Sequence, residues 1–202
     1  MIYMKYEHLL IFGLVMVVAW FLFTYFWPRL LLYVFKRGIL ANGFGDGPIP
    51  VNTLQTESPA LFADPIHPPA SASKLITTGV NRDTLITAGW LDLNKGVQVL
   101  HVPDMAGRYY SVQFTDPSKN TNFAYVGTRT TGTQAGDYLI TRRGWNGQVP
   151  DGMTQIFSPN ASVLLLGRVL VENDSDLPAA YDLSKQIQLT PLSGWQPSQP
   201  VA

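Results

Sequence analysis

Four charged side chains are the best candidates for binding chemistry in this chain of 202 residues. Arg82 and Asp83 stand just before an alternating segment, Arg108 opens another, and Arg129 lies in the Gly-Thr-Arg-Thr-Thr-Gly turn 127–132. Guanidinium groups bind carboxylates and phosphates through paired hydrogen bonds, and backbone N–H groups of such a turn can add donors. The four residues are therefore candidate ligands of an anionic group. The alternative is that each only stabilises its own loop.

The motifs of common catalytic sites are absent from the sequence. It contains no G-x-S-x-G, Walker, H-E-x-x-H or dinucleotide-binding pattern. His8, His67 and His101 lack the spacing of metal ligands, and the absence of cysteine excludes disulfides and thiolate sites. We therefore predict no catalytic residue, no metal and no cofactor. A formal net charge of zero also argues against a nucleic-acid partner.

Period-two alternation predicts the strands that position these side chains. Arg108–Thr115 places Tyr110, Val112 and Phe114 on one face and polar residues on the other. Tyr109 falls on the polar face, which makes it a candidate aromatic residue of an interface. Similar runs, separated by Gly, Pro, Asn and Asp turns, are Thr84–Leu93, Val97–Val102, Asn122–Thr128, Asp137–Arg142, Met153–Ser158 and Ala161–Glu172. Strands at this spacing indicate an all-β sandwich or barrel.

A short helix is predicted after the strands, over Asp176–Leu189. Asp176 is its expected N-cap, Pro178 lies in its first turn, and Pro191 is expected to end it. Before the strands, six prolines within 22 residues predict an extended linker, in which Leu61-Phe62 is expected as a short helical turn docked on the β domain. The expected organisation is an anchor over residues 1–41, a Pro-rich linker over 42–73, a β domain over 74–195 and a tail over 196–202.

Leu9–Trp27 is a run of 19 uncharged residues, twelve of which are Leu, Ile, Val or Phe. A helix of this length spans about 28 Å, close to the hydrocarbon thickness of a bilayer. We predict a transmembrane helix that Pro28 stops or kinks. Leu30–Phe35 either extends this helix or lies in the membrane interface. A cleaved signal peptide is the alternative, but its apolar region would be shorter and would end in small residues.

The orientation of the predicted anchor is ambiguous. Arg29, Lys36 and Arg37 come after the apolar run and only Lys5 precedes it, which by the positive-inside rule favours a cytoplasmic domain. A signal anchor, in contrast, exports the domain on its C-terminal side. We expect a single-pass protein of the bacterial inner membrane with a periplasmic domain, and the lipid bilayer as one partner.

Several short segments together resemble the domain of unknown function 1254 family. These segments are Gly79–Leu85, Trp90–Leu93, Val102–Asp104, Gly107–Gln113, Gly127–Gly132, Gly136–Ile140, Leu166–Arg168 and Leu189–Leu192. The resemblance runs from Thr77 to Trp195. It implies an immunoglobulin-like β-sandwich and a bacterial envelope protein, and it implies no particular reaction.

Larger relatives in that family continue into a second domain, the jelly roll of the domain of unknown function 1214. The resemblance therefore implies that a separate protein of that type is a partner. Leu177 and Leu192, which bound the C-terminal segment, are with Tyr109 the predicted interface residues. The alternative is that the segment near Leu61 and Phe62 covers this surface and leaves a self-sufficient monomer.

Two functions are consistent with these observations. The preferred one is a non-catalytic, membrane-anchored envelope module for binding or assembly. The other is a periplasmic hydrolase or a protein that binds a small anionic ligand through Arg82, Asp83, Arg108 and Arg129. A structure discriminates between them by showing whether these four side chains converge.

Overall fold

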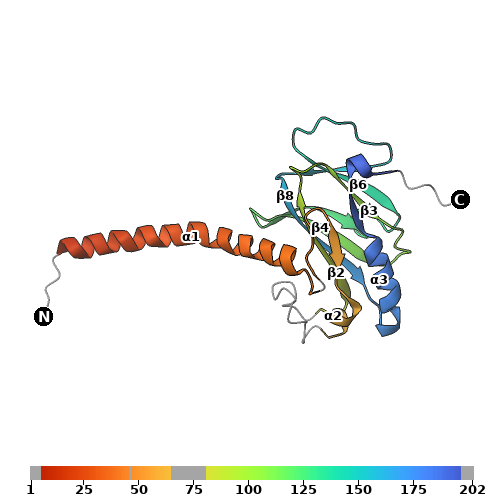
Figure 1. Cartoon of the computed structure of the whole chain (residues 1–202), viewed down its shortest axis with the longest axis horizontal. Helices are drawn as coiled ribbons and strands as arrows, with labels where there is room; N and C mark the ends of the chain where they lie inside the picture. The colour runs from red at the N-terminus through yellow and green to blue at the C-terminus, as the bar shows by residue number, and fades with distance from the viewer. Residues whose placement is uncertain (1–5, 46, 65–80, 197–202) are drawn as a thin grey trace. The chain divides into compact units, whose positions relative to one another are not determined.

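The computed structural model describes residues 6–45, 47–64 and 81–196. By its internal contacts the chain divides into two compact units, residues 1–36 and residues 37–202. The first unit holds most of helix α1 (Tyr6–Asn42), and the second holds both β-sheets. Figure 1 shows the helices and strands of each unit.

Helix α1 runs through Pro28 without interruption, so of the two outcomes predicted for this residue the stop is wrong, and the kink stays a prediction. A proline inside a helix removes one backbone hydrogen bond and leaves the others in place. The segment Leu30–Phe35 therefore extends the helix, which was one of the two alternatives for it. The apolar side chains from Leu9 to Val34 are largely exposed. Within the described residues, α1 is the one helix long and apolar enough to cross a membrane.

The last turn of α1 and the segment after it belong to the second unit. Ile39, Phe44 and Ile49 are each 1% exposed. Gly43 ends the helix with a φ of 51°, a left-handed conformation that glycine adopts without strain. A side chain at this position would also collide with Gln55 Oε1. Residues 39–49 are therefore packed against the β domain.

The region expected as an extended linker is folded over residues 42–63. It contains strand β1 (Leu54–Thr56) and helix α2 (Pro59–Ala63), whose N-terminus is capped by Ser58 Oγ accepting from Leu61 N. Leu61 and Phe62 are buried, and Phe62 joins the main core. Helix α2 confirms the helical turn predicted at Leu61-Phe62, whereas β1, which is three residues long, was not predicted. The rest of the expected linker, residues 65–73, lies outside the described residues.

All seven strands predicted from alternation are present, with bounds that differ by a few residues. They are β2 (Thr84–Asp92), β3 (Gln98–Val102), β4 (Tyr110–Asp116), β5 (Thr121–Gly127), β6 (Gly136–Arg142), β7 (Thr154–Ser158) and β8 (Ser162–Leu170). The turns predicted between these strands are also present. Gly and Asn have a positive φ at several of them, such as Gly96, Asn120 and Gly152.

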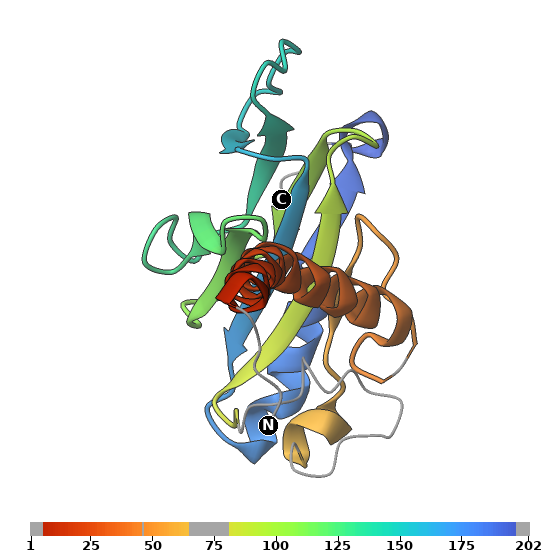
Figure 2. The ribbon, with the colours of Figure 1, turned by 90° about the vertical axis from the view of Figure 1, so that its left-hand side faces the viewer.

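The strands form two sheets that share one apolar core. Sheet A has the order β1-β2-β8-β4-β5, and sheet B has the order β7-β6-β3-β9, where β9 is Gln188–Pro191. All pairs are antiparallel except β6 and β7, which are parallel. Figure 2 shows β2 and β8 side by side, and they pair over nine residues. Core residues come from the inner faces of both sheets, for example Leu85, Tyr110, Leu165, Leu100 and Ile140.

The C-terminal helix is shorter than predicted. A 3₁₀ turn over Asp174–Asp176 precedes α3, which spans Leu177–Gln186, and the residues after it form β9 and a second 3₁₀ turn, Leu192–Gly194. Ile187 is extended and 2% exposed, so burial of this side chain ends the helix before β9 pairs with β3. Pro191 therefore ends a strand rather than a helix. Within the predicted tail, residues 197–202 lie outside the described residues.

Candidate functional site

The outer face of sheet A, which points away from sheet B, is covered at one end and open at the other. Directly opposed residues Gln55, Ala88, Leu166, Gln113 and Tyr125 form one row across its five strands. At the β1–β2 end, Gly43 lies directly over Gln55 of this row, and Ala88 is 1% exposed. At the β4–β5 end, Gln113 is half-buried and Tyr125 is exposed.

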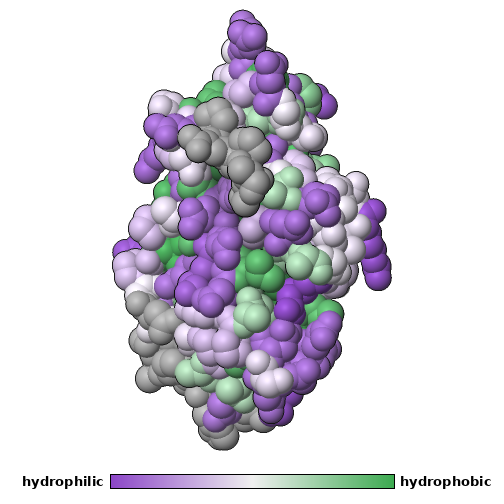
Figure 3. Space-filling model, turned by 90° about the vertical axis from the view of Figure 1, so that its right-hand side faces the viewer, coloured by the Kyte–Doolittle hydropathy of each residue, from purple (hydrophilic) through white to green (hydrophobic). Residues whose placement is uncertain are grey.

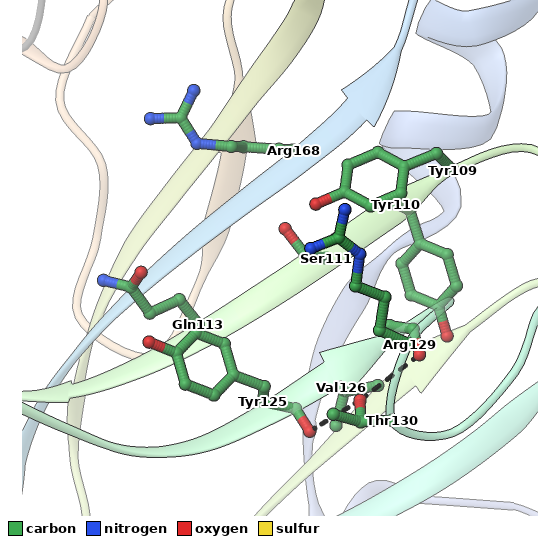
Figure 4. A pocket seen from close by; sticks show the side chains of 10 residues that line it. Tyr109, Tyr110, Ser111, Gln113, Tyr125, Val126, Arg129, Thr130 and Arg168 are labelled. Carbon is green, nitrogen blue, oxygen red and sulfur yellow. Dashed lines mark hydrogen bonds between the residues drawn. The ribbon is translucent and has the colours of Figure 1, made fainter.

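A pocket of about 380 Å³ lies at the open end of this face. Its size falls in the range of small-molecule sites. The side chains around it are shown in Figure 4. The lining residues come from β4, β5, β8 and the turn after β5, and they are Tyr109, Tyr110, Ser111, Gln113, Tyr125, Val126, Gly127, Arg129, Thr130 and Arg168. The site thus combines two guanidinium groups, aromatic rings and strand hydroxyl and amide groups.

Neither pocket arginine is engaged by a carboxylate. Arg129 and Arg168 are both exposed, and neither forms an ion pair within the described part of the chain. Arg168 Nη1 is 3.4 Å from Thr84 Oγ1, and the Arg129 guanidinium lies 5.9 Å from the centroid of the Tyr109 ring. Arg129 is therefore available to an anion from solution, and Arg168, whose charge also acts on Glu57, is held by no ion pair among the described residues.

A directional chain of hydrogen bonds fixes the polar wall of the pocket. Gln113 Nε2 donates to Thr115 Oγ1, which donates to Asn122 Oδ1 at 2.8 Å. Asn122 Nδ2 in turn donates to Tyr125 Oη at 2.7 Å. Because Tyr125 Oη accepts this bond, its own hydrogen remains free to be donated. The chain holds Gln113 and Tyr125 in place and leaves one O–H donor at the pocket.

Three backbone N–H groups of the hydroxyl-rich turn after β5 are used within the chain. Thr128 N donates to Tyr110 O, and Thr130 N and Thr131 N both donate to Gly127 O. The Thr131 hydroxyl accepts from Gly127 N, and the Thr130 hydroxyl donates to Tyr125 O. The turn stabilises itself, which was the alternative interpretation, and Arg129 is the group that it presents to the pocket.

The structure does not bring the four predicted ligand residues together. Arg108 forms a two-pronged ion pair with Asp176, with distances of 2.5 and 2.6 Å, and also donates to Leu170 O. This ion pair lowers the pKa of Asp176 to about 2 and raises that of Arg108. Arg82 and Asp83 precede β2 and do not line the pocket. Of the predicted set, Arg129 alone belongs to the pocket.

The predicted N-cap of α3 has a different task. Asp176 makes no side-chain hydrogen bond to the first turn of the helix. Its carboxylate instead accepts from Arg108 and from Glu172 N. The residue therefore ties the start of α3 to the beginning of β4.

Of the predicted interface residues, Tyr109 lines the pocket, whereas Leu177 and Leu192 do not. Tyr109 is half-buried and lines the pocket, so its place on the polar face was correctly inferred. Leu177 packs against the main core, and Leu192 is partly buried in the last 3₁₀ turn. The face in Figure 3 is mostly hydrophilic, with hydrophobic residues in small separate groups. Among the described residues after 36, the exposed large hydrophobic side chains are Tyr125 and Phe157.

Glu57 and the His101–Asp137 pair lie outside the pocket. Glu57, 7% exposed at the β1 side of sheet A, has its pKa raised to about 7, chiefly by burial, while the hydrogen bond from Ile86 N and the charge of Arg168 act in the opposite direction. His101 is paired across strands with Asp137 at a distance of 2.7 Å. No group of three or more metal-ligating side chains occurs among the residues that the structure describes.

Sequence reasoning missed Arg168, Tyr125, Ser111 and Gln113 as site residues. Alternation placed Ser111 and Gln113 on the polar face of their strand. It does not show that β8 and β5 flank that strand, because these pairings depend on the folded topology.

Comparisons with known proteins give a fold relative and a family. The chain is similar to the crystal structure of the VPA0106 protein from Vibrio parahaemolyticus, with 25% sequence identity and a TM-score of 0.60. The match covers 88% of this chain and 40% of that one, so the chain spans less than half of that protein. No curated protein matches the chain. A family model for proteins of unknown function, DUF1254, matches residues 64–191, more than half of the sequence, and the chain therefore belongs to the DUF1254 family.

Proposed function

We propose that this chain is a membrane-anchored, non-catalytic binding protein whose ligand is a small anion. The observation that carries the proposal is the pocket on the outer face of sheet A, whose lining contains two arginines and neither a carboxylate nor an imidazole. Such a lining attracts and holds an anion. It lacks the paired acid and base that hydrolysis of an ester or glycoside requires.

The architecture proposed with this function is an immunoglobulin-like β-sandwich of the bacterial envelope. The two sheets with a common core support a sandwich, and the apolar surface of α1 supports a single-pass anchor. We place the domain in the periplasm. Alkaline phosphatase fused after Ala202 should then be active in cells, and an inactive fusion beside a fluorescent cytoplasmic reporter would reverse the orientation.

A separate DUF1214-type protein is the alternative ligand of this module. The structure gives this alternative less support than the pocket gives to an anion. Leu177 is used inside the domain, and Phe62 already covers part of the core, as a self-sufficient monomer requires. A partner would have to use the mostly polar surface that the described residues present.

Binding of anions to the full chain in lipid nanodiscs tests the proposed function. We would screen a mixture of small organic anions and their uncharged analogues by ligand-observed NMR. Several anions should bind, and the double variant Arg129→Gln, Arg168→Gln should abolish their signals. Arg82→Gln is the matched control because this exposed arginine does not line the pocket. If neutral analogues bind equally well, or if the control loses binding as much as the double variant, the proposal fails.

A further inference from the structure

We infer that the anion recognised by this pocket is a carboxylate carried on a flat, ring-like body. This inference rests on the proposed function and names the chemical class of its ligand. It is argued from the shape of the floor, the aromatic residues beside it, and the number and kind of hydrogen-bond donors that the pocket leaves unused.

The floor of the pocket is a strand surface rather than a deep hole. Ser111 and Gln113, two residues apart on β4, project from the same face of the sheet. They lie between the neighbouring strands β8 and β5, which carry Arg168 and Tyr125. A flat ring can lie along such a surface and contact the strand over its whole face. A branched aliphatic body would contact it at few points.

Two tyrosine rings add apolar area beside this floor. Tyr109 is half-buried and Tyr125 is exposed, and both line the pocket. Stacked or edge contacts between two aromatic rings stabilise a complex beyond what the buried area alone contributes. The hydrogen bond from Asn122 to Tyr125 Oη holds this ring before any ligand arrives. Holding the ring in place lowers the entropy lost on binding.

The donors fit a carboxylate better than a phosphate. Phosphate sites commonly use several backbone N–H groups of a turn or helix start. Here the N–H groups of Thr128, Thr130 and Thr131 are used within the chain. The group that remains beside the tyrosines is the Arg129 guanidinium, which lies near Ser111 in Figure 4, whereas the Arg168 side chain points away from it. Together with a hydroxyl donor such as Tyr125 Oη, the paired N–H groups of this guanidinium can satisfy two carboxylate oxygens.

Titration of four small probes tests this inference in the same nanodisc preparation. The probes are 4-fluorobenzoate, its neutral analogue 4-fluorobenzamide, inorganic phosphate, and fluoroacetate as a carboxylate that lacks a ring. We expect 4-fluorobenzoate to bind at least tenfold more tightly than each of the other three. Arg129→Gln should weaken benzoate at least tenfold, and Tyr125→Leu should weaken benzoate severalfold without affecting fluoroacetate.

The outcomes separate this inference from the proposed function. If phosphate or fluoroacetate binds as tightly as 4-fluorobenzoate, the pocket does bind anions, but the inference that its ligand is a carboxylate on a flat ring is wrong. If Tyr125→Leu weakens fluoroacetate as much as benzoate, the role of the ring is wrong. If no anion binds, both the inference and the proposed function are overturned.

Discussion

The two ends of the outer face of sheet A are both built from paired strands, but one end is buried and the other is accessible. At the β2 end, Trp90 is 1% exposed and its Nε1 donates to Ser162 Oγ at 2.7 Å. At the β4–β5 end, Gln113 and Tyr125 stay accessible and line a pocket. The difference arises from the segment on top, since Gly43 and its neighbours lie against Gln55 at the first end. A sheet face is thus buried or accessible according to its cover, and residue types match that division.

Arg108 and Arg129 show a similar contrast between a side chain held inside the fold and an accessible one. Arg108 is 15% exposed and held by Asp176, whereas Arg129 is exposed and forms no ion pair within the described chain. Both are next to β4, and both were predicted to bind a ligand. A charge that already has a buried counter-charge stabilises the fold, and a charge without one is available for recognition.

The largest expected effect separates the covered end from the open end. Trp90→Ala should lower the free energy of unfolding by about 3–5 kcal/mol, because it removes a buried ring and leaves Ser162 without its donor. Tyr125→Ala should lower it by less than about 1 kcal/mol, because this ring is exposed. Urea denaturation followed by circular dichroism measures both. Equal losses for the two variants would mean that the two ends do not differ in cover.

A pH titration sharpens the same comparison at the β1 edge. Burial raises the pKa of Glu57 from 4.5 to about 7, so the folded state binds more protons than the unfolded state between these values. Stability should therefore fall as the pH rises from about 4.5 to about 7, by on the order of 3 kcal/mol, and stay level above. Glu57→Gln should remove this dependence and be the more stable protein at pH 8, since the amide oxygen can still accept from Ile86 N. A wild-type profile that is flat across this window would contradict the burial of Glu57.

The smallest expected effects separate the two arginines. Arg108→Gln should destabilise the domain by about 1–3 kcal/mol, because it breaks a partly buried ion pair. Arg129→Gln should change stability by no more than about 0.5 kcal/mol while it weakens anion binding.

Acid sensitivity provides a second readout for this pair of variants. Asp176 has its pKa lowered to about 2, so the stabilisation from its ion pair is present above about pH 4 and lost as the pH falls towards 2. Arg108→Gln should reduce that acid-dependent loss to the part that comes from the hydrogen bond of Glu172 N to Asp176, and Arg129→Gln should retain all of it. The contrast between the arginines fails if Arg129→Gln is the more destabilising variant.

Local sequence patterns predicted the strands well because alternation and turn residues act over short distances. The seven alternating runs became β2 to β8, and Tyr109 was placed on the correct face. The helical turn at Leu61 and Phe62 is α2, but the short strands β1 and β9 were missed, since three or four residues carry too little periodicity. The pocket was found only in part. Arg129 stood out from its turn, but Arg168 reaches the site through a pairing of strands about 55 residues apart in the chain.

The central position of β8 in sheet A has a consequence for how the protein is made. β2 pairs with β8 from Thr84↔Leu170 to Asp92↔Ser162, and β4 also depends on β8 for its place in the sheet. At typical elongation rates, β2 leaves the ribosome on the order of 10 s before its partner strand does. Throughout that interval its apolar side chains have no sheet to join, and such non-local pairing also slows folding itself. The nascent domain therefore needs protection by a chaperone or by continuous translocation until residue 170 has emerged, and a nonsense or frameshift change before that point should yield an aggregation-prone chain instead of a smaller folded one.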